Sequence, residues 1–159
     1  MMRRFIAAAL TYSLSVSAEQ PAVDSSLAML RAIDSVKIEL SLASCHNRNA
    51  SVACVSLTMK NVQSMISYGY KTVKRHGIKW QGQYPTEDKT DAQTAADVSA
   101  IHDALYFVAV STCDGRSDLS QACIIAEKLA LDDLMRQGIA LETTENLQHQ
   151  QGLTMPPKA

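Results

Sequence analysis

Apolar residues recur every three or four positions along four stretches of the chain, which is the pattern of helices that each bury one side. In the first half, residues 25–45 and the stretch that ends near residue 76 both alternate steps of four and three. Antiparallel helix pairs bury such stripes, so the pattern predicts a helical hairpin over residues 25–76. Gly69 lies within the second stripe and predicts a close helix approach or a bend. The two stripes are Met29, Ile33, Val36, Leu40 and Ala43, and then Val55, Met59, Val62, Ile66, Gly69 and Val73.

A second hairpin is predicted over residues 91–140, after a linker at 77–90 whose first residue is a helix-ending glycine. Its first helix has the widest apolar side and is expected to be the most buried. Its second helix is expected to be capped by Ser117 and to carry Lys128 on its exposed side. Beyond that helix the chain becomes polar and rich in Gln, which predicts a frayed, flexible tail over residues 143–159.

Each predicted turn contains a pair of cysteines, and the two pairs match. Cys45 and Cys54 enclose a polar turn, as do Cys113 and Cys123; in both pairs Arg follows the first cysteine by three positions and Ala precedes the second. The turns favour local pairing over the other two connectivities. Each bond would close a short loop and stabilise the fold by roughly 2–3 kcal/mol. We therefore expect one all-α domain, residues 19–142, in which two disulfide-stapled antiparallel helical hairpins form a four-helix bundle-like fold.

The first eighteen residues are typical of a secretory signal peptide. Arg3 and Arg4 precede an apolar run over residues 5–16, and small residues occupy the positions before a cleavage site at Ala18. The alternative is an amphipathic N-terminal helix. Residues 1–18 are too short for a permanent span, and no later stretch is apolar enough to insert stably in a membrane. Together with the paired cysteines, the signal indicates a periplasmic or secreted protein.

The charge of the chain is distributed unevenly. The whole sequence carries −1, and removing a signal peptide with two Arg and no acid leaves −3. Residues 19–83 carry +4 and residues 84–159 carry −7. The favoured interpretation is that the hairpins dock partly through complementary faces; the other is that one face meets a charged partner. The negative net charge argues against nucleic acid as that partner.

Catalytic motifs are missing from the sequence. There is no Gly-x-Ser-x-Gly nucleophile elbow. His102 and Asp103 are adjacent, so on a helix they point about 100° apart and form no dyad. The neighbouring acids of Asp132–Asp133 and Glu87–Asp88 do not face each other across a cleft, as glycosidases require. The chain is therefore expected to have no catalytic residues, although a small secreted enzyme remains an alternative.

Metal ions and cofactors are not expected either. The cysteines are too far apart for zinc ligand pairs, and covalent haem would require a Cys-x-x-Cys-His motif. A non-covalent haem between Met29 or Met59 and His102 is conceivable in a four-helix bundle, but a single His at the edge of an apolar stripe is more often a packing residue.

The richest group of unusual residues lies around the end of the first hairpin. Cations here stabilise a helix C-terminus, and the only Trp could plug the end of the core. The other interpretation is a contact surface, because Trp, Tyr and Arg often anchor interfaces and loops on rigid scaffolds often bind. A partner would then be a protein with an acidic patch. The candidate binding residues are Lys74, Arg75, Lys79, Trp80 and Tyr84.

These observations favour a non-catalytic protein that acts by protein–protein binding, as an inhibitor, an immunity protein or a chaperone does. In size, compartment and helicity the chain is similar to small disulfide-bonded helical immunity proteins that neutralise cell-wall-cutting toxins; no motif residue carries this similarity. The alternative classes are a four-helix carrier of haem or lipid and a secreted envelope-acting enzyme. Binding predicts a closed apolar core with an exposed loop around Trp80, whereas an enzyme predicts a pocket that gathers His102 with acids from another helix.

Overall fold

The computed structural model describes residues 25–46, 48, 51–84 and 92–154, with side chains as far as residue 144. These residues form four α-helices: α1 (Ser25–His46), α2 (Val52–His76), α3 (Ala92–Gly115) and α4 (Gln121–Thr154). The predicted all-α fold of two helical hairpins is confirmed. The predicted signal peptide and most of the second half of the linker lie outside the described residues.

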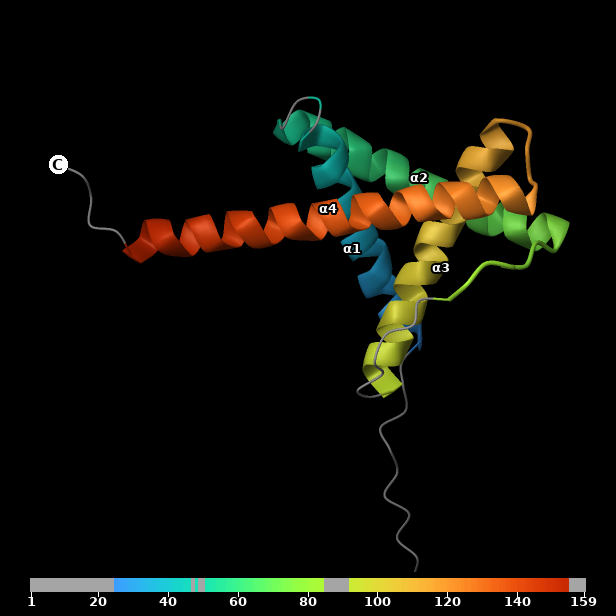
Figure 1. Ribbon diagram of the computed structural model, residues 1–159, viewed down its shortest axis with the longest axis horizontal. Helices are drawn as coiled ribbons and strands as arrows, with labels where there is room; N and C mark the ends of the chain where they lie inside the picture. The colour runs from blue at the N-terminus through green and yellow to red at the C-terminus, as the bar shows by residue number, and fades with distance from the viewer. Residues whose placement is uncertain (1–24, 47, 49–50, 85–91, 155–159) are drawn as a thin grey trace, which may run out of the picture.

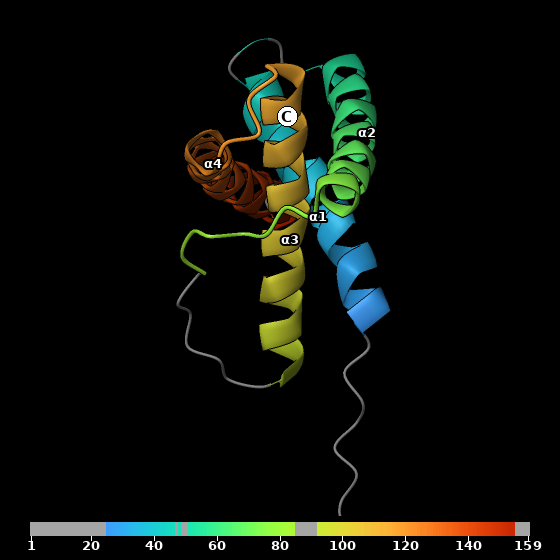
Figure 2. The same ribbon diagram turned by 90° about the vertical axis from the view of Figure 1, so that its right-hand side faces the viewer.

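The central pair of helices is α1 and α3, which lie side by side and run in the same general direction (Figure 1). Helix α2 packs on both from one side and α4 packs on both from the other, and within the described residues α2 and α4 do not touch (Figure 2). Because α4 crosses the central pair steeply, the bundle consists of two crossed hairpins.

The core lies where the two hairpins cross. Three apolar clusters fill it, and α3 contributes to all three, as its wide apolar side predicts. The largest cluster draws on every helix and joins the hairpins, whereas the buried members of the second cluster all lie in α3 and α4. The buried members of the largest cluster are Val36, Leu40, Val62, Ile66, Ala104, Leu105, Val108 and Met135.

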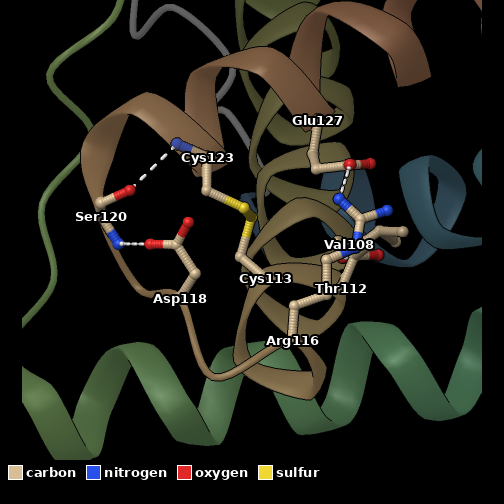
Figure 3. Close-up of a disulfide and its surroundings, with 8 residues drawn as sticks. All are labelled: Val108, Thr112, Cys113, Arg116, Asp118, Ser120, Cys123 and Glu127. Carbon is tan, nitrogen blue, oxygen red and sulfur yellow. Dashed lines mark hydrogen bonds and ion pairs between the residues drawn. A yellow bond between two sulfur atoms is a disulfide. The ribbon is translucent and has the colours of Figure 1, made fainter.

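Each hairpin is closed at its elbow by its own disulfide bond. The bonds join Cys45 to Cys54 and Cys113 to Cys123, with Cα–Cα distances of 5.9 and 6.1 Å. Figure 3 shows the second bond between the end of α3 and the first turn of α4. The local pairing predicted from the polar turns is confirmed.

The helices that follow the elbows begin in the same way. The Ser51 hydroxyl accepts a hydrogen bond from the Cys54 amide at 3.1 Å, and the Ser120 hydroxyl accepts one from the Cys123 amide at 3.2 Å (Figure 3). Ser120, and not the predicted Ser117, therefore caps α4. Ser117 instead adopts a left-handed conformation, with φ of 55°, in the turn that follows α3.

Two glycines allow the hairpins to cross with their backbones in contact. A Cβ added at Gly69 in α2 would lie 1.8 Å from the Phe107 carbonyl oxygen in α3, and one at Gly138 in α4 would lie 2.1 Å from the Glu39 carbonyl oxygen in α1. Each glycine follows the second cysteine of its hairpin by fifteen residues, and each carbonyl precedes the first cysteine of the other hairpin by six. The hairpins therefore pack through equivalent contacts, related by an approximate twofold axis. The predicted close approach at Gly69 is confirmed; the approach at Gly138 was not predicted.

The hairpins differ at their far ends. Helix α2 ends at Gly77, which has φ of 61° and donates its amide hydrogen to the Val73 carbonyl oxygen, as the sequence predicts. Helix α4 continues to Thr154, well beyond its predicted end near residue 140, and extends past the other helices (Figure 1). Most of the segment expected to fray, residues 143–154, is thus helical, because polar residues predict little burial but do not prevent a helix.

A buried acid marks the crossing of α1 and α4. The Glu39 side chain is buried beside the Glu142 carboxyl. Burial, and secondly the hydrogen bond and charge of Glu142, raise the pKa of Glu39 from 4.5 to about 8. The folded protein therefore keeps a proton on Glu39 at neutral pH, whereas the unfolded chain has lost it.

This difference predicts how stability changes with pH. Between pH 4.5 and 8 the unfolded chain binds fewer protons at Glu39, so this group lowers the free energy of unfolding as pH rises. Glu39→Gln should match the wild type near pH 4 and exceed it by roughly 4 kcal/mol at pH 8. Urea unfolding at a series of pH values measures this. Asp34→Asn, at an exposed site on the same helix, should retain the wild-type pH dependence; a constant offset for Glu39→Gln would contradict the assignment.

Candidate functional site

The segment that joins the hairpins crosses α3 below α4, and we call residues 77–84 the strap (Figures 1 and 2). Gln121, in the first turn of α4, donates a hydrogen bond from Nε2 to the Lys79 carbonyl oxygen at 3.0 Å. Ile78 and Trp80 pack against the cluster around the second disulfide. The strap is thus held on both helices of the second hairpin.

Trp80 points inward from the strap. Its ring lies 5.1 Å from the His102 ring and 5.6 Å from the Tyr106 ring, both edge-on, and the Lys128 ammonium lies 5.7 Å from its centroid. Such aromatic and cation–π contacts stabilise the position of Trp80 in addition to the stabilisation from burying its apolar surface. Of the two interpretations of Trp80, the plug describes the half-buried indole, which lies between α3 and α4, while Lys79 and Gln81 on either side of it are exposed.

His102 lies beneath Trp80 and is only 2% exposed. Burial, and secondly the nearby Lys128 ammonium, lower the pKa of His102 from 6.5 to about 4, partly opposed by Asp132. Lys128, itself 2% exposed, donates to Asp132 at 2.8 Å. The structure thus brings His102 near an acid of another helix, but under Trp80 and the Tyr84 ring, which is 4.7 Å away. A substrate cannot reach the imidazole there.

Lys128 is the member of this group that the sequence analysis misplaced. It was expected on the exposed side of α4 because it is charged. Its spacing could have shown that it is buried. Ile124, Lys128, Leu131 and Met135 follow one another at steps of four, three and four, so Lys128 lies on the same side of α4 as the buried Ile124 and Met135. Long side chains of this kind can bury their stems and still pair their charged end.

The other four candidate binding residues are exposed. Lys74 and Arg75 lie in the last turn of α2, and Lys79 and Tyr84 lie on the strap. The Lys74 ammonium is 5.4 Å from the centroid of the Tyr70 ring. The predicted patch is therefore divided: its cations face solvent, while its Trp faces the core.

Helix α2 presents a cationic outer face. It contains no Asp or Glu, and Lys60, Lys71, Lys74 and Arg75 are all exposed along it. None of these four forms an ion pair with an acid in the described residues. Tyr68 and Tyr70, which the sequence analysis did not single out, are exposed on the same helix.

Three described acids of the second hairpin pair within it, while Asp114 accepts a hydrogen bond from the Tyr68 hydroxyl of α2. Glu127 pairs with Arg116, Asp132 with Lys128 and Asp133 with Arg136, all within that hairpin. In the part of the chain that the structure describes, one ion pair joins the hairpins, between Arg31 and Asp97 at 3.4 Å. Complementary charges therefore join the hairpins at this pair, but within the described residues they do not pair with the cations of α2.

Two hollows lie along the seam between α1 and α2. One, of about 490 Å³, is shallow and lined by residues that include Lys37, Met59 and Lys60. The other, of about 230 Å³, lies at the first elbow, where Val52 and Leu141 line it. Ligand pockets for small molecules are commonly enclosed and of about 300–1,000 Å³. Neither hollow is an interior cavity that would suit a haem or lipid carrier, and Met59 lines the seam while His102 lies under the strap.

Among the described side chains no group of three or more His, Cys, Asp or Glu is placed to hold a metal ion. No helix in the described ranges has the length and hydropathy needed to span a bilayer. Comparisons of the chain with protein-family profiles, curated protein sequences and solved structures find no match.

Proposed function

We propose that the chain is a non-catalytic periplasmic or secreted protein that binds an acidic protein partner through the outer face of α2. Its action would be that of an inhibitor, an immunity protein or a chaperone. The observation that carries the proposal is the row of exposed cations on a helix without acids, none of which forms an ion pair among the described residues. An isolated row of like charges repels itself, so an anionic partner would stabilise it.

The scaffold suits such a role because it holds α2 rigidly. The inner side of the helix is buried by contacts with α1 and α3, including the close approach at Gly69. A preorganised surface loses little conformational entropy on binding. Arg75, Tyr68 and Tyr70 are residue types that often anchor interfaces. Lys79 and Tyr84, the other exposed candidates, lie on the strap, which leads from the end of α2 to the seam between α3 and α4.

The compartment follows from the cysteines and the N-terminus. Disulfides persist in oxidising environments, and both bonds here are structural, since they close the elbows on which the hairpins depend. Together with the signal peptide proposed for residues 1–18, they support export.

Neutralising the cations of α2 should abolish partner capture. A photo-cross-linking residue at the exposed Ser67 position would identify the partner in the source cells by mass spectrometry. Lys71→Gln/Lys74→Gln/Arg75→Gln should then weaken binding of the purified partner by about tenfold or more, or ~1.4 kcal/mol, with most of the loss reproduced by salt.

The matched control is Arg31→Gln/Arg116→Gln/Arg136→Gln. It removes the same charge from exposed cations that already have acidic partners, and it should leave binding nearly unchanged. Equal binding by wild type and the α2 variant would contradict the proposal. Cross-links to lipid or nucleic acid in place of an acidic protein would show that the partner class is wrong.

A further inference from the structure

The seam between the two helices of a hairpin is covered in one hairpin and open in the other. The strap follows α2 and lies on the seam between α3 and α4. By the approximate twofold axis, a segment that follows α4 would lie on the seam between α1 and α2. That segment is instead part of α4 itself, which runs straight on to Thr154 and away from the body (Figure 1).

Equivalent residues show the effect of the strap. His102 and Tyr106 precede the first cysteine of their hairpin by eleven and seven residues, as Asp34 and Ile38 do in the other. Under the strap His102 and Tyr106 are 2% and 5% exposed. On the open seam Ile38 is 37% exposed, and the Asp34 side chain is 73% exposed.

The second helices show the same contrast. Gln121, which binds the strap, is half-buried, whereas its equivalent Val52 is 84% exposed. Lys128, under Trp80, corresponds to Met59, which lines the larger hollow of the open seam. Ser56 lines both hollows, so they adjoin as one shallow groove along the open seam; its apolar residues include Met59 in the larger hollow and Val52, Val55 and Leu141 at the elbow.

We propose that this groove docks an extended segment of a partner protein, with a large aromatic side chain seated over Met59 and reaching toward Ile38, the equivalent of Tyr106. The strap provides the precedent within the same molecule, since it seats Trp80 on the equivalent positions of the second hairpin. An exposed apolar patch with polar edges is typical of an interaction site.

The charges beside the groove specify the neighbours of the aromatic residue. Lys37 and Lys60 both line the larger hollow. Lys60 has no acidic partner among the described residues. Lys37 forms a long ion pair, at 3.9 Å, with the exposed Asp34, so its charge is weakly neutralised. The docked segment should therefore carry an acidic residue next to its aromatic one. Assigning this segment to the acidic partner of α2 rests on the proposed function, whereas the groove stands on its own geometry.

The test uses two synthetic peptides with the sequence of residues 77–84, one unchanged and one carrying Lys79→Glu. Titrated into the ¹⁵N-labelled full chain, the Lys79→Glu peptide should shift the amide signals of Ile38, Val52 and Met59 in NMR spectra. The unchanged peptide should bind at least several-fold more weakly, because its lysine faces Lys37 and Lys60. Absence of binding, equal binding of the two peptides, or shifts confined to His102 and Tyr106 would overturn the proposal.

Two variants complete the test. Val52→Asp should weaken binding of the Lys79→Glu peptide about fivefold or more, and because Val52 is largely exposed the fold should be unaffected. Leu129→Asp places the same charge at an exposed apolar site on α4 and should bind as the wild type does. Binding that survives Val52→Asp would contradict the site. Neutralising the α2 cations leaves the groove intact, so failure of the proposed function and failure of this inference are distinguishable.

Discussion

Replacing Gly69 or Gly138 with alanine is expected to lower the free energy of unfolding by about 3 kcal/mol, although alanine is the better helix former by about 1 kcal/mol. The added Cβ would lie about 2 Å from a carbonyl oxygen of the facing helix. A backbone atom cannot rotate away as a side chain can, so the helices must separate, and the packing of the core is lost along the crossing. For a chain of this size the melting temperature should fall by roughly 10 °C.

The matched control is Gly115→Ala. A Cβ at Gly115, the last residue of α3, has no neighbour within 4 Å. Thermal and urea unfolding should therefore show a change of less than about 1 kcal/mol. If Gly69→Ala and Gly138→Ala were also neutral, the close crossings would not exist and the hairpins would pack in another way. The two glycine variants should also resemble each other, because the twofold relation makes their contacts equivalent.

Removing both disulfides is expected to have a still larger effect. The bonds span separations of 9 and 10 residues, and each should contribute roughly 2–3 kcal/mol. Their joint loss, about 5 kcal/mol, is comparable to the whole stability of many small domains. Alanine is the suitable replacement, since Cys45 and Cys113 are buried and serine would bury an additional hydroxyl there.

The measurement is urea unfolding of Cys45→Ala/Cys54→Ala, Cys113→Ala/Cys123→Ala and the four-alanine variant. The two pairs should be destabilised by similar amounts, and the four-alanine variant by about their sum. Reduction of the wild type should lower its free energy of unfolding by as much as the four alanine substitutions do. The same reductant should not affect the four-alanine variant. An unchanged unfolding midpoint after reduction would show that the bonds do not hold the elbows.

The helices and the disulfides were predictable because their causes are local. A step of three or four between apolar residues is a property of one helix, and a short polar turn between two cysteines brings them together whatever lies elsewhere. Gly69 was predictable for the same reason, as a glycine within an apolar stripe. Gly138 occupies the equivalent place, fifteen residues after the second cysteine, but was not predicted.

The errors concern what covers each helix, which is not a local property. Lys128 was placed in solvent because its charge outweighed its position in the stripe, and the strap that covers it comes from another part of the chain. For Trp80 the sequence left two interpretations open, a plug of the core and part of a contact surface, because the residues that it packs against lie in another part of the chain. The polar segment after residue 140 was expected to fray, but its threonines donate hydrogen bonds to carbonyl oxygens one turn earlier, and α4 continues.

The candidate binding surface was only partly predictable. The cations near the end of α2 are evident in the sequence, and four of the five proposed residues are exposed in the structure. The sequence could not show that, among the described residues, these cations form no ion pairs, because Glu127, Asp132 and Asp133 pair within the second hairpin. The same acids appeared, from net charge alone, to be the natural complement of α2.

Helix α2 can serve as a rigid platform only if each hairpin is closed by its own disulfide bond. Trypsin can cut at Arg48 and Arg116, which lie inside the two disulfide loops, so each bond should join two tryptic peptides. A non-reducing digest of the oxidised protein, analysed by mass spectrometry, should contain peptide 38–48 linked to 49–60 and peptide 90–116 linked to 117–128. A link between either of the first two peptides and either of the last two, or four free thiols, would contradict the account.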